Sequence, residues 1–221
     1  MAHIPLVIAT GNAGKAAEIE ALLSGFPVTI KYLGDFGPLP PVEEDGLTFE
    51  ANAYKKAAFT ARVLGMPALA DDSGLVVAAL DGRPGVLSAR YGEPGWSDAQ
   101  RGARLLEEMA GREDRRAAFE CVISVAVPDG PALTYEGRCE GLIAEAPAGE
   151  NGFGYDPIFF YPPLNKTFAQ LDRQTKSTVS HRGQALGELR EEFDKVLKWI
   201  ELQMPPAQYN ALLGAAGPGA H

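Results

Sequence analysis

The 221-residue chain has few of the residues that build metal clusters and disulfide frameworks. Its two cysteines, Cys121 and Cys139, form no CxxC pair, and no histidine stands at metal-ligand spacing from them. We therefore expect buried core thiols rather than a zinc site or a disulfide. No apolar run reaches the ~18 residues that a membrane-spanning helix needs. The N-terminus lacks a charged segment followed by an apolar one, so we expect no secretory signal and a cytoplasmic protein.

Basic residues are also in deficit, because 29 acidic residues outnumber 20 basic ones and give a net charge of −9. This field repels duplex DNA and long RNA, which argues against nonspecific binding of nucleic acids. The apolar fraction of 46% and the charged fraction of 22% are ordinary for a globular protein. A polyanionic ligand would have to be held by local cations, backbone N–H groups or a metal ion.

Strand-like and helical segments alternate, which predicts an α/β fold with a mixed sheet. The expected strands cover 4–9, 28–33, 117–127 and 132–144, the last two as an antiparallel hairpin. The expected helices cover 15–23, 48–64, 97–109 and 183–202. We expect one domain over 1–202 and an uncharged tail, rich in Ala, Gly and Pro, over 203–221 that is flexible or loosely docked.

The first segment with chemical potential is the turn from Thr10 to Lys15, with the sequence TGNAGK. A strand, a turn of small residues and a helix place backbone N–H groups and a helix N-terminus at one point, which favours anions. The turn is not a Walker A loop, because Ala9 and Ala16 replace the first glycine and the hydroxyl residue of that motif. Taken alone, an ordinary turn with a solvated lysine fits the pattern equally well.

Carboxylates gather at two places, with Glu43, Glu44 and Asp45 before a helix and Asp71-Asp72 at the end of an apolar run. Mg²⁺ prefers oxygen ligands and is usually held by one or two carboxylates together with phosphate oxygens and water. Successive strand side chains point to opposite faces, so only one of the two adjacent aspartates can face a given site. Two exposed acidic turns are the alternative interpretation.

Two later segments could read a nucleobase. Residues 176–183 cluster cations and hydroxyls before a helix, although a solvated loop with Ser180 as the N-cap fits as well. Residues 152–157 flank an aromatic ring with glycines, although a core aromatic is the more common outcome. Lys56 and Arg90 are single candidates, and a lone helical lysine is usually solvated.

These segments occur together and in order in one family. The chain closely resembles the inosine triphosphate pyrophosphatases, also called dITP/XTP pyrophosphatases, over roughly residues 4–200. The resemblance rests on six segments: TGNAGK, EEDGLTFEANAYKKA, ALADDSGL, PGVLSARY, NGFGYDPIF and KSTVSHRGQAL.

The resemblance implies a homodimer with an elongated α/β fold, two lobes and a cleft between them. It implies Mg²⁺-dependent hydrolysis of ITP, dITP and XTP to the monophosphate and pyrophosphate. Glu44 and Asp72 match the metal positions, and Asp72 also matches the general base. Substrate-binding positions match Thr10, Gly11, Asn12, Ala13, Gly14, Lys15, Lys56, Ser73, Phe153, Gly154, Tyr155, Asp156, Lys176, His181 and Arg182. Asp71 and Arg90 are candidate supporting residues.

Three alternatives stay open at this point. The first is a pyrophosphatase acting on standard or modified pyrimidine nucleotides, and the second is a nucleotide-binding regulator without turnover. The third, a P-loop kinase or GTPase, is disfavoured because the Walker residues are absent.

Overall fold

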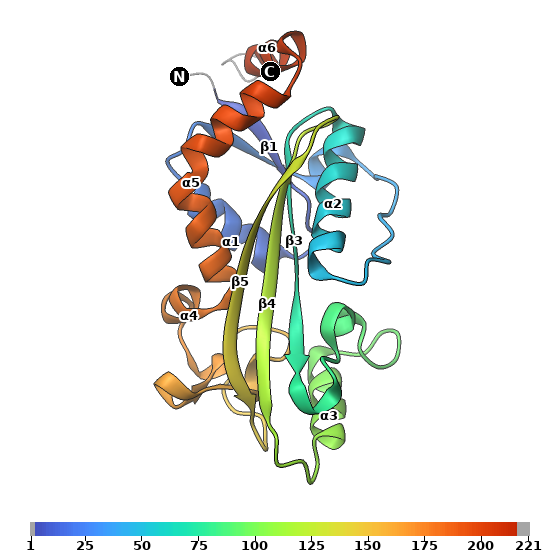
Figure 1. Cartoon of the computed structure of the whole chain (residues 1–221), viewed down its shortest axis with the longest axis vertical. Coiled ribbons are helices and arrows are strands. Elements are labelled where there is room, and N and C mark those ends of the chain that lie inside the picture. Colours follow the sequence, from blue (N-terminus) through green and yellow to red (C-terminus); the bar gives the residue numbers. More distant parts are fainter. Residues whose placement is uncertain (1–2, 216–221) are drawn as a thin grey trace. The chain divides into compact units, whose positions relative to one another are not determined.

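The computed structural model describes residues 3–215, and Figure 1 draws its helices and strands. The strands are β1 (Ile4–Ile8), β2 (Val28–Tyr32), β3 (Ala68–Val77), β4 (Arg116–Ala126), β5 (Ala132–Ile143), β6 (Phe159–Tyr161) and β7 (Lys166–Thr167). The α-helices are α1 (Ala13–Leu23), α2 (Phe49–Leu64), α3 (Asp98–Glu108), α4 (Arg173–Val179), α5 (His181–Gln203) and α6 (Pro206–Ala215). Short 3-10 helices are η1 (Leu33–Phe36), η2 (Ala78–Leu80), η3 (Gly85–Arg90), η4 (Asp156–Ile158), η5 (Pro162–Leu164) and η6 (Phe168–Gln170).

The strands form a seven-stranded sheet in the order β2-β1-β3-β4-β5-β6-β7. Strand β1 pairs in parallel with β2 and β3, whereas β6 pairs antiparallel with β5 and β7. The neighbouring strands β4 and β5 are separated only by residues 127–131, and so short a link joins antiparallel strands. The sheet is therefore mixed, and the predicted α/β class is confirmed.

The chain divides into two compact units. Within the described residues, unit 1 holds 3–72, 122–135 and 186–215, and unit 2 holds 73–121 and 136–185. In strand β3 the division falls between Asp72 and Ser73. Each candidate cluster described below lies within one unit.

Small side chains let helix α2 pack closely on the strands of unit 1. The buried cluster there comprises Val7, Ala9, Ala57, Ala61, Ala68, Ala70 and Ala126. Thr48 is the N-cap of the helix, because its side chain accepts a hydrogen bond from the Ala51 N–H, and Gly65 ends the helix with φ of 66°. Figure 1 shows α2 on one side of these strands and α1 with α5 on the other.

Aromatic rings fill the core of unit 2. The Phe119 ring lies 4.6 Å from Phe159 and 5.7 Å from Phe168, measured between centroids. Cys139 and Tyr155 belong to the same buried cluster. This apolar interior also holds the 176–183 segment in place, because the His181 ring stacks on Phe119 at 4.7 Å.

Both cysteines are buried thiols outside any disulfide, so the expectation of core thiols is confirmed. Burial raises the pKa of Cys139 to about 11. At pH 8 only about one such thiol in a thousand is ionised, and the thiolate is the reactive form. We expect neither thiol to react with Ellman's reagent over minutes in the native protein, and both to react in guanidinium chloride. Rapid labelling of the native protein would contradict the closed core.

The structure differs from the sequence analysis near the C-terminus. Residues 173–179 form α4, so the loop interpretation of 176–183 is wrong over 176–179, and α5 begins at His181 rather than residue 183. A further helix, α6, follows α5 within the segment expected as a tail, and the Gln208 amide donates to the Gly65 carbonyl. The flexibility of 203–221 stays a prediction, and 216–221 lie outside the described residues.

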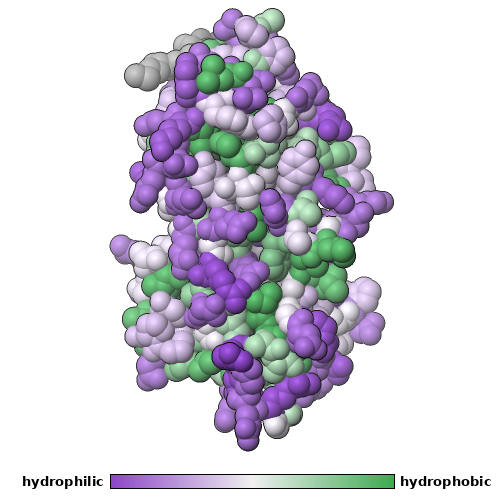
Figure 2. Space-filling view, viewed as in Figure 1, coloured by the Kyte–Doolittle hydropathy of each residue, from purple (hydrophilic) through white to green (hydrophobic). Residues whose placement is uncertain are grey.

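The surface carries both polar and apolar residues. Figure 2 shows hydrophilic residues interspersed with smaller apolar areas on the face that it draws. Within residues 3–215, no helix is long and apolar enough to cross a membrane.

Candidate functional site

The TGNAGK turn leads from β1 directly into α1. The Thr10 hydroxyl oxygen accepts from the Asn12 N–H at 3.2 Å, and the Asn12 side-chain oxygen accepts from the Lys15 N–H at 3.1 Å. Asn12 is thus the N-cap, and α1 begins at Ala13. The first N–H groups of a helix lack partners within it, so this turn presents donors and a positive dipole end to an anion.

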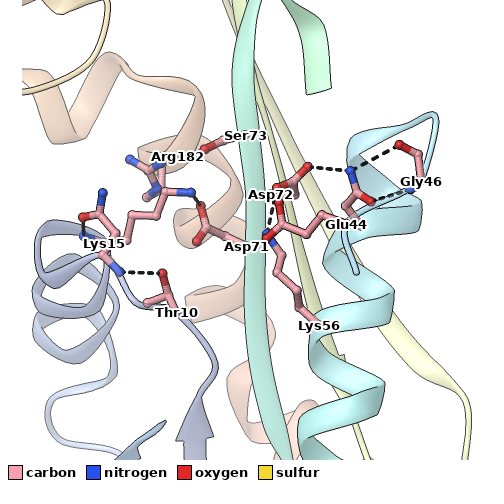
Figure 3. A network of polar contacts seen from close by, with 11 residues as sticks. Thr10, Lys15, Glu44, Gly46, Lys56, Asp71, Asp72, Ser73 and Arg182 are labelled. Atoms are coloured by element: carbon pink, nitrogen blue, oxygen red, sulfur yellow. Dashed lines mark hydrogen bonds and ion pairs between the residues drawn. The ribbon is translucent and has the colours of Figure 1, made fainter. Parts of the chain in front are cut away.

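The two adjacent aspartates lie within β3, rather than at its end as the sequence suggested. Their side chains point to opposite sides of the strand, as predicted from strand geometry (Figure 3). Asp71 Oδ2 lies 2.8 Å from Lys15 Nζ in α1, and Asp72 Oδ1 lies 2.7 Å from Lys56 Nζ in α2. One strand therefore connects the phosphate-loop candidate to the acidic candidates.

Lys56 also contacts the acidic loop before α2. Its Nζ lies 3.5 Å from Glu44 Oε1 and 2.7 Å from Asp72 Oδ1. The two carboxylate oxygens are therefore at most 6.2 Å apart. Lysine and both carboxylates form one charged cluster, with side-chain exposures of 14% for Lys56, 36% for Glu44 and 11% for Asp72.

Burial and charge act against each other in this cluster. Burial raises the pKa of Asp72, and the Lys56 and Lys15 ammonium groups oppose that rise. Burial alone would lower the pKa of Lys56, but Asp72, Asp71 and Glu44 outweigh it and raise that pKa. Lys56 therefore stays charged at neutral pH, and the Asp72 carboxylate binds a proton more readily than an exposed aspartate.

The carboxylates of this cluster suit a hard divalent cation that takes its remaining ligands from other molecules. Glu44 and Asp72 offer the carboxylate oxygens that Mg²⁺ prefers. Among residues 3–215, no three His, Cys, Asp or Glu residues are grouped closely enough to hold a metal ion by themselves. A cation here would need oxygens from another source, and Mg²⁺ commonly takes them from phosphate groups and water.

A second cluster lies in unit 2 around the ring of Phe153, which is 36% exposed. Lys176 Nζ lies 4.8 Å and the Arg182 guanidinium carbon 5.6 Å from the ring centroid. Lys176 also pairs with Asp156, which accepts a hydrogen bond from the Phe153 backbone N–H at 2.9 Å. Burial raises the pKa of Asp156, against the effect of Lys176.

Backbone geometry fixes this second cluster. Gly152 has φ of 78°, and a Cβ there would stand 2.0 Å from Asp156 Oδ2, so no larger residue fits. Arg182 NH2 donates to Ser73 Oγ at 2.9 Å. Ser180 Oγ accepts from the Gly183 N–H at 3.0 Å, so Ser180 caps α5, as one interpretation of the sequence had it.

Three predicted site residues are placed elsewhere. The Tyr155 side chain lies in the core, where its hydroxyl donates to the Ser88 carbonyl at 2.9 Å. The His181 ring is buried against Phe119. Arg90 is exposed at the end of η3. Their roles in substrate binding stay predictions, and Tyr155 and His181 adjoin cluster residues in sequence.

Sequence reasoning missed one residue of the first cluster. Asn52 of α2 is fully buried, and its amide lies 3.4 Å from Asp72 Oδ2. The available signal was spacing, because residues 52 and 56 are four apart on α2 and therefore share one face.

Fold and site together define an α/β protein with a helix N-terminus, two lysines and neighbouring carboxylates arranged along one strand. The model of the Ham1 family matches residues 6–192, and the chain belongs to this family. A dITP/XTP pyrophosphatase of Syntrophobacter fumaroxidans is 62% identical over 200 residues, covering 90% of this chain and 86% of that protein. One of Thermus thermophilus is 50% identical over 190 residues, covering 85% and 91%.

Solved structures agree with the fold. A HAM1 protein from Coxiella burnetii has a TM-score of 0.82 at 43% identity, covering 87% of this chain and 99% of that one. A nucleoside-triphosphatase / dITP/XTP pyrophosphatase from Mycobacterium abscessus has a TM-score of 0.72 at 40% identity, covering 84% and 97%.

Proposed function

We propose that this chain hydrolyses the deaminated purine nucleoside triphosphates ITP, dITP and XTP to the monophosphate and pyrophosphate. The observation that carries the proposal is the array along β3, where Asp71 pairs with Lys15 and Asp72 with Lys56 beside the start of α1. Phosphoryl transfer depends mainly on positioning and on neutralising charge, and this array supplies both. The names of the relatives support the same reaction.

Unit 1 is assigned to the phosphates. Lys15, Lys56 and the N–H groups of residues 10–15 stabilise the negative charge that develops on the departing pyrophosphate. Asp72 accepts the proton of the attacking water, and its raised pKa suits a group that must bind that proton at neutral pH. Asp71 is a positioning residue that holds the Lys15 ammonium group.

Mg²⁺ is the proposed cofactor, held by Glu44 and Asp72 with the substrate phosphates. When bound, it supplies positive charge that polarises the phosphate oxygens. Although the protein is acidic, two lysines, the N–H donors of the helix and one cation would together offset the negative charge of the substrate.

Unit 2 is assigned to the base. Hypoxanthine and xanthine carry an acceptor oxygen at position 6, where adenine carries an amino donor. Lys176 and Arg182 can only donate, so they match the oxygen and not the amino group. The exposed Phe153 ring offers a surface for stacking. Guanine also has the oxygen, and no residue here accounts for its rejection.

The competing enzyme, acting on pyrimidine nucleotides, is distinguished by a substrate panel. A regulator without turnover would not need the Asp72-Lys56-Glu44 arrangement. A homodimer, a cytoplasmic location and a single two-lobed domain over 1–202 are further parts of the proposal.

Pyrophosphate release from ITP is the direct assay. With Mg²⁺ we expect pyrophosphate and IMP in equal amounts, and with EDTA in place of Mg²⁺ we expect no release above background. Binding of ITP without any release would favour the regulator. Equal release in EDTA would refute the metal assignment.

A further inference from the structure

The acidic loop that carries Glu44 is attached to α2 by one buried side chain. Asn52 Oδ1 accepts from the Gly46 N–H at 2.8 Å, and Asn52 Nδ2 lies 3.3 Å from the Gly46 carbonyl oxygen. The amide thus pairs with both backbone groups of one residue. A nearby ion pair between Lys55 and Asp45 attaches the same loop to the same helix.

The same amide group also reaches the second carboxylate. Asn52 Nδ2 lies 3.4 Å from Asp72 Oδ2, while Asp72 Oδ1 pairs with Lys56. Each oxygen of Asp72 therefore has its own partner on α2, which limits rotation of the carboxylate. Asn52 is 0% exposed, so water cannot substitute for these contacts.

Close packing at Gly46 makes the contact specific. A Cβ added to Gly46 would stand 2.5 Å from Asn52 Oδ1 and 2.9 Å from the Ala51 Cβ. Gly46 has no positive φ that would demand glycine, so close approach to Asn52 is the physical reason for this residue. Gly46 is two residues from Glu44, and moving it moves that carboxylate.

We infer that Asn52 is a positioning residue for the divalent cation, because it fixes the Glu44 loop and the Asp72 carboxylate relative to each other. This inference rests on the proposed function. Partners that orient metal ligands typically change metal affinity or activity by about 10–100-fold when removed. The side-chain amide of Asn52 contacts Gly46 and Asp72, so we expect its loss to act on the cation first.

The test compares Asn52→Ala with the wild-type enzyme by two readouts. The first is Mn²⁺ affinity, measured by electron paramagnetic resonance with a non-hydrolysable α,β-imido analogue of ITP. The second is the Mg²⁺ concentration that gives half-maximal pyrophosphate release. We expect both constants to rise by about 10–100-fold, while KM for ITP at saturating Mg²⁺ stays within about threefold.

Thr60→Ala is the matched control. Thr60 is buried at 3% exposure on the same helix, about two turns further on, and its loss should lower stability without changing the metal constants. Gly46→Ala is the second variant. The added methyl group disturbs the contact between Gly46 and Asn52 from the side of the partly exposed loop. This variant therefore tests the inference even if Asn52→Ala fails to fold.

The experiments distinguish failure of the positioning role of Asn52 from failure of the metal assignment. Metal constants within twofold of wild type in Gly46→Ala and in any folded Asn52→Ala would overturn the positioning role. The same rise in Thr60→Ala would also overturn it, because lost stability would then be the cause. A wild-type enzyme that releases pyrophosphate without a divalent cation would refute the metal assignment, and the inference with it.

Discussion

Asp72→Asn is expected to lower kcat for ITP by about 10²–10⁴-fold, the range that a positioned proton acceptor contributes. Asparagine keeps the shape of the side chain but cannot accept the proton and is a weaker ligand for a cation. The fold should persist, because burial already disfavours the Asp72 charge and Lys56 keeps its contact with Glu44. Steady-state kinetics at saturating Mg²⁺, with thermal unfolding of both proteins, measures the effect.

Asp81→Asn is the matched control for charge. Asp81 is exposed and has φ of 53°, a conformation that asparagine also adopts without strain. We expect wild-type kcat from this control. A kcat for Asp72→Asn within threefold of wild type would refute the assignment of Asp72 as proton acceptor and metal ligand.

The second large effect concerns the base. We expect kcat/KM for ITP to exceed that for ATP by at least about 5–150-fold, which corresponds to the roughly 1–3 kcal/mol for leaving a buried donor unpaired. An adenine amino group facing Arg182 or Lys176 would leave donors on both sides without acceptors. Parallel assays of the two nucleotides under the same Mg²⁺ concentration measure the ratio.

Arg182→Met tests whether Arg182 is responsible for the preference for ITP over ATP. The side chain keeps its apolar stem against Phe153 but loses the donors that point to Ser73 and to the proposed base oxygen. We expect kcat/KM for ITP to fall and the preference over ATP to shrink toward one. Arg173→Met, an exposed arginine in the same unit, should change neither. Equal kcat/KM for ITP and ATP in the wild-type enzyme would reject the selection model.

Local patterns made much of this site predictable. The turn from Thr10 to Lys15 lies between a strand and a helix, and it could be placed because capping and turn chemistry act over a few residues. The opposite orientation of Asp71 and Asp72 followed from strand geometry alone. Their separate partners, Lys15 and Lys56, could not be predicted, because these pairings join residues 56 and 16 positions apart.

Tertiary context explains the failures. Helix α4 has no apolar stripe, and its start depends on Asp172, whose side chain accepts from the Thr175 N–H at 2.7 Å. The sequence also did not reveal that the rings of Tyr155 and His181, which were assigned by resemblance, pack in the aromatic core of unit 2. Asn52 was overlooked because an asparagine within a helix is ordinarily exposed, and only burial reveals its contacts.

The turn from Thr10 to Lys15 differs from a Walker A loop in one respect that concerns the cation. Because Ala16 follows Lys15, this turn lacks the hydroxyl that helps to hold the cation in a Walker A loop. We propose that the oxygens come instead from Asp72 and Glu44, both of which contact Lys56.

Product analysis with ITP tests the central claim most directly. Phosphorus NMR of the reaction with Mg²⁺ should show inorganic pyrophosphate and IMP appearing together, without IDP at any time. Orthophosphate together with IDP would place cleavage at the terminal phosphate and contradict the proposed reaction.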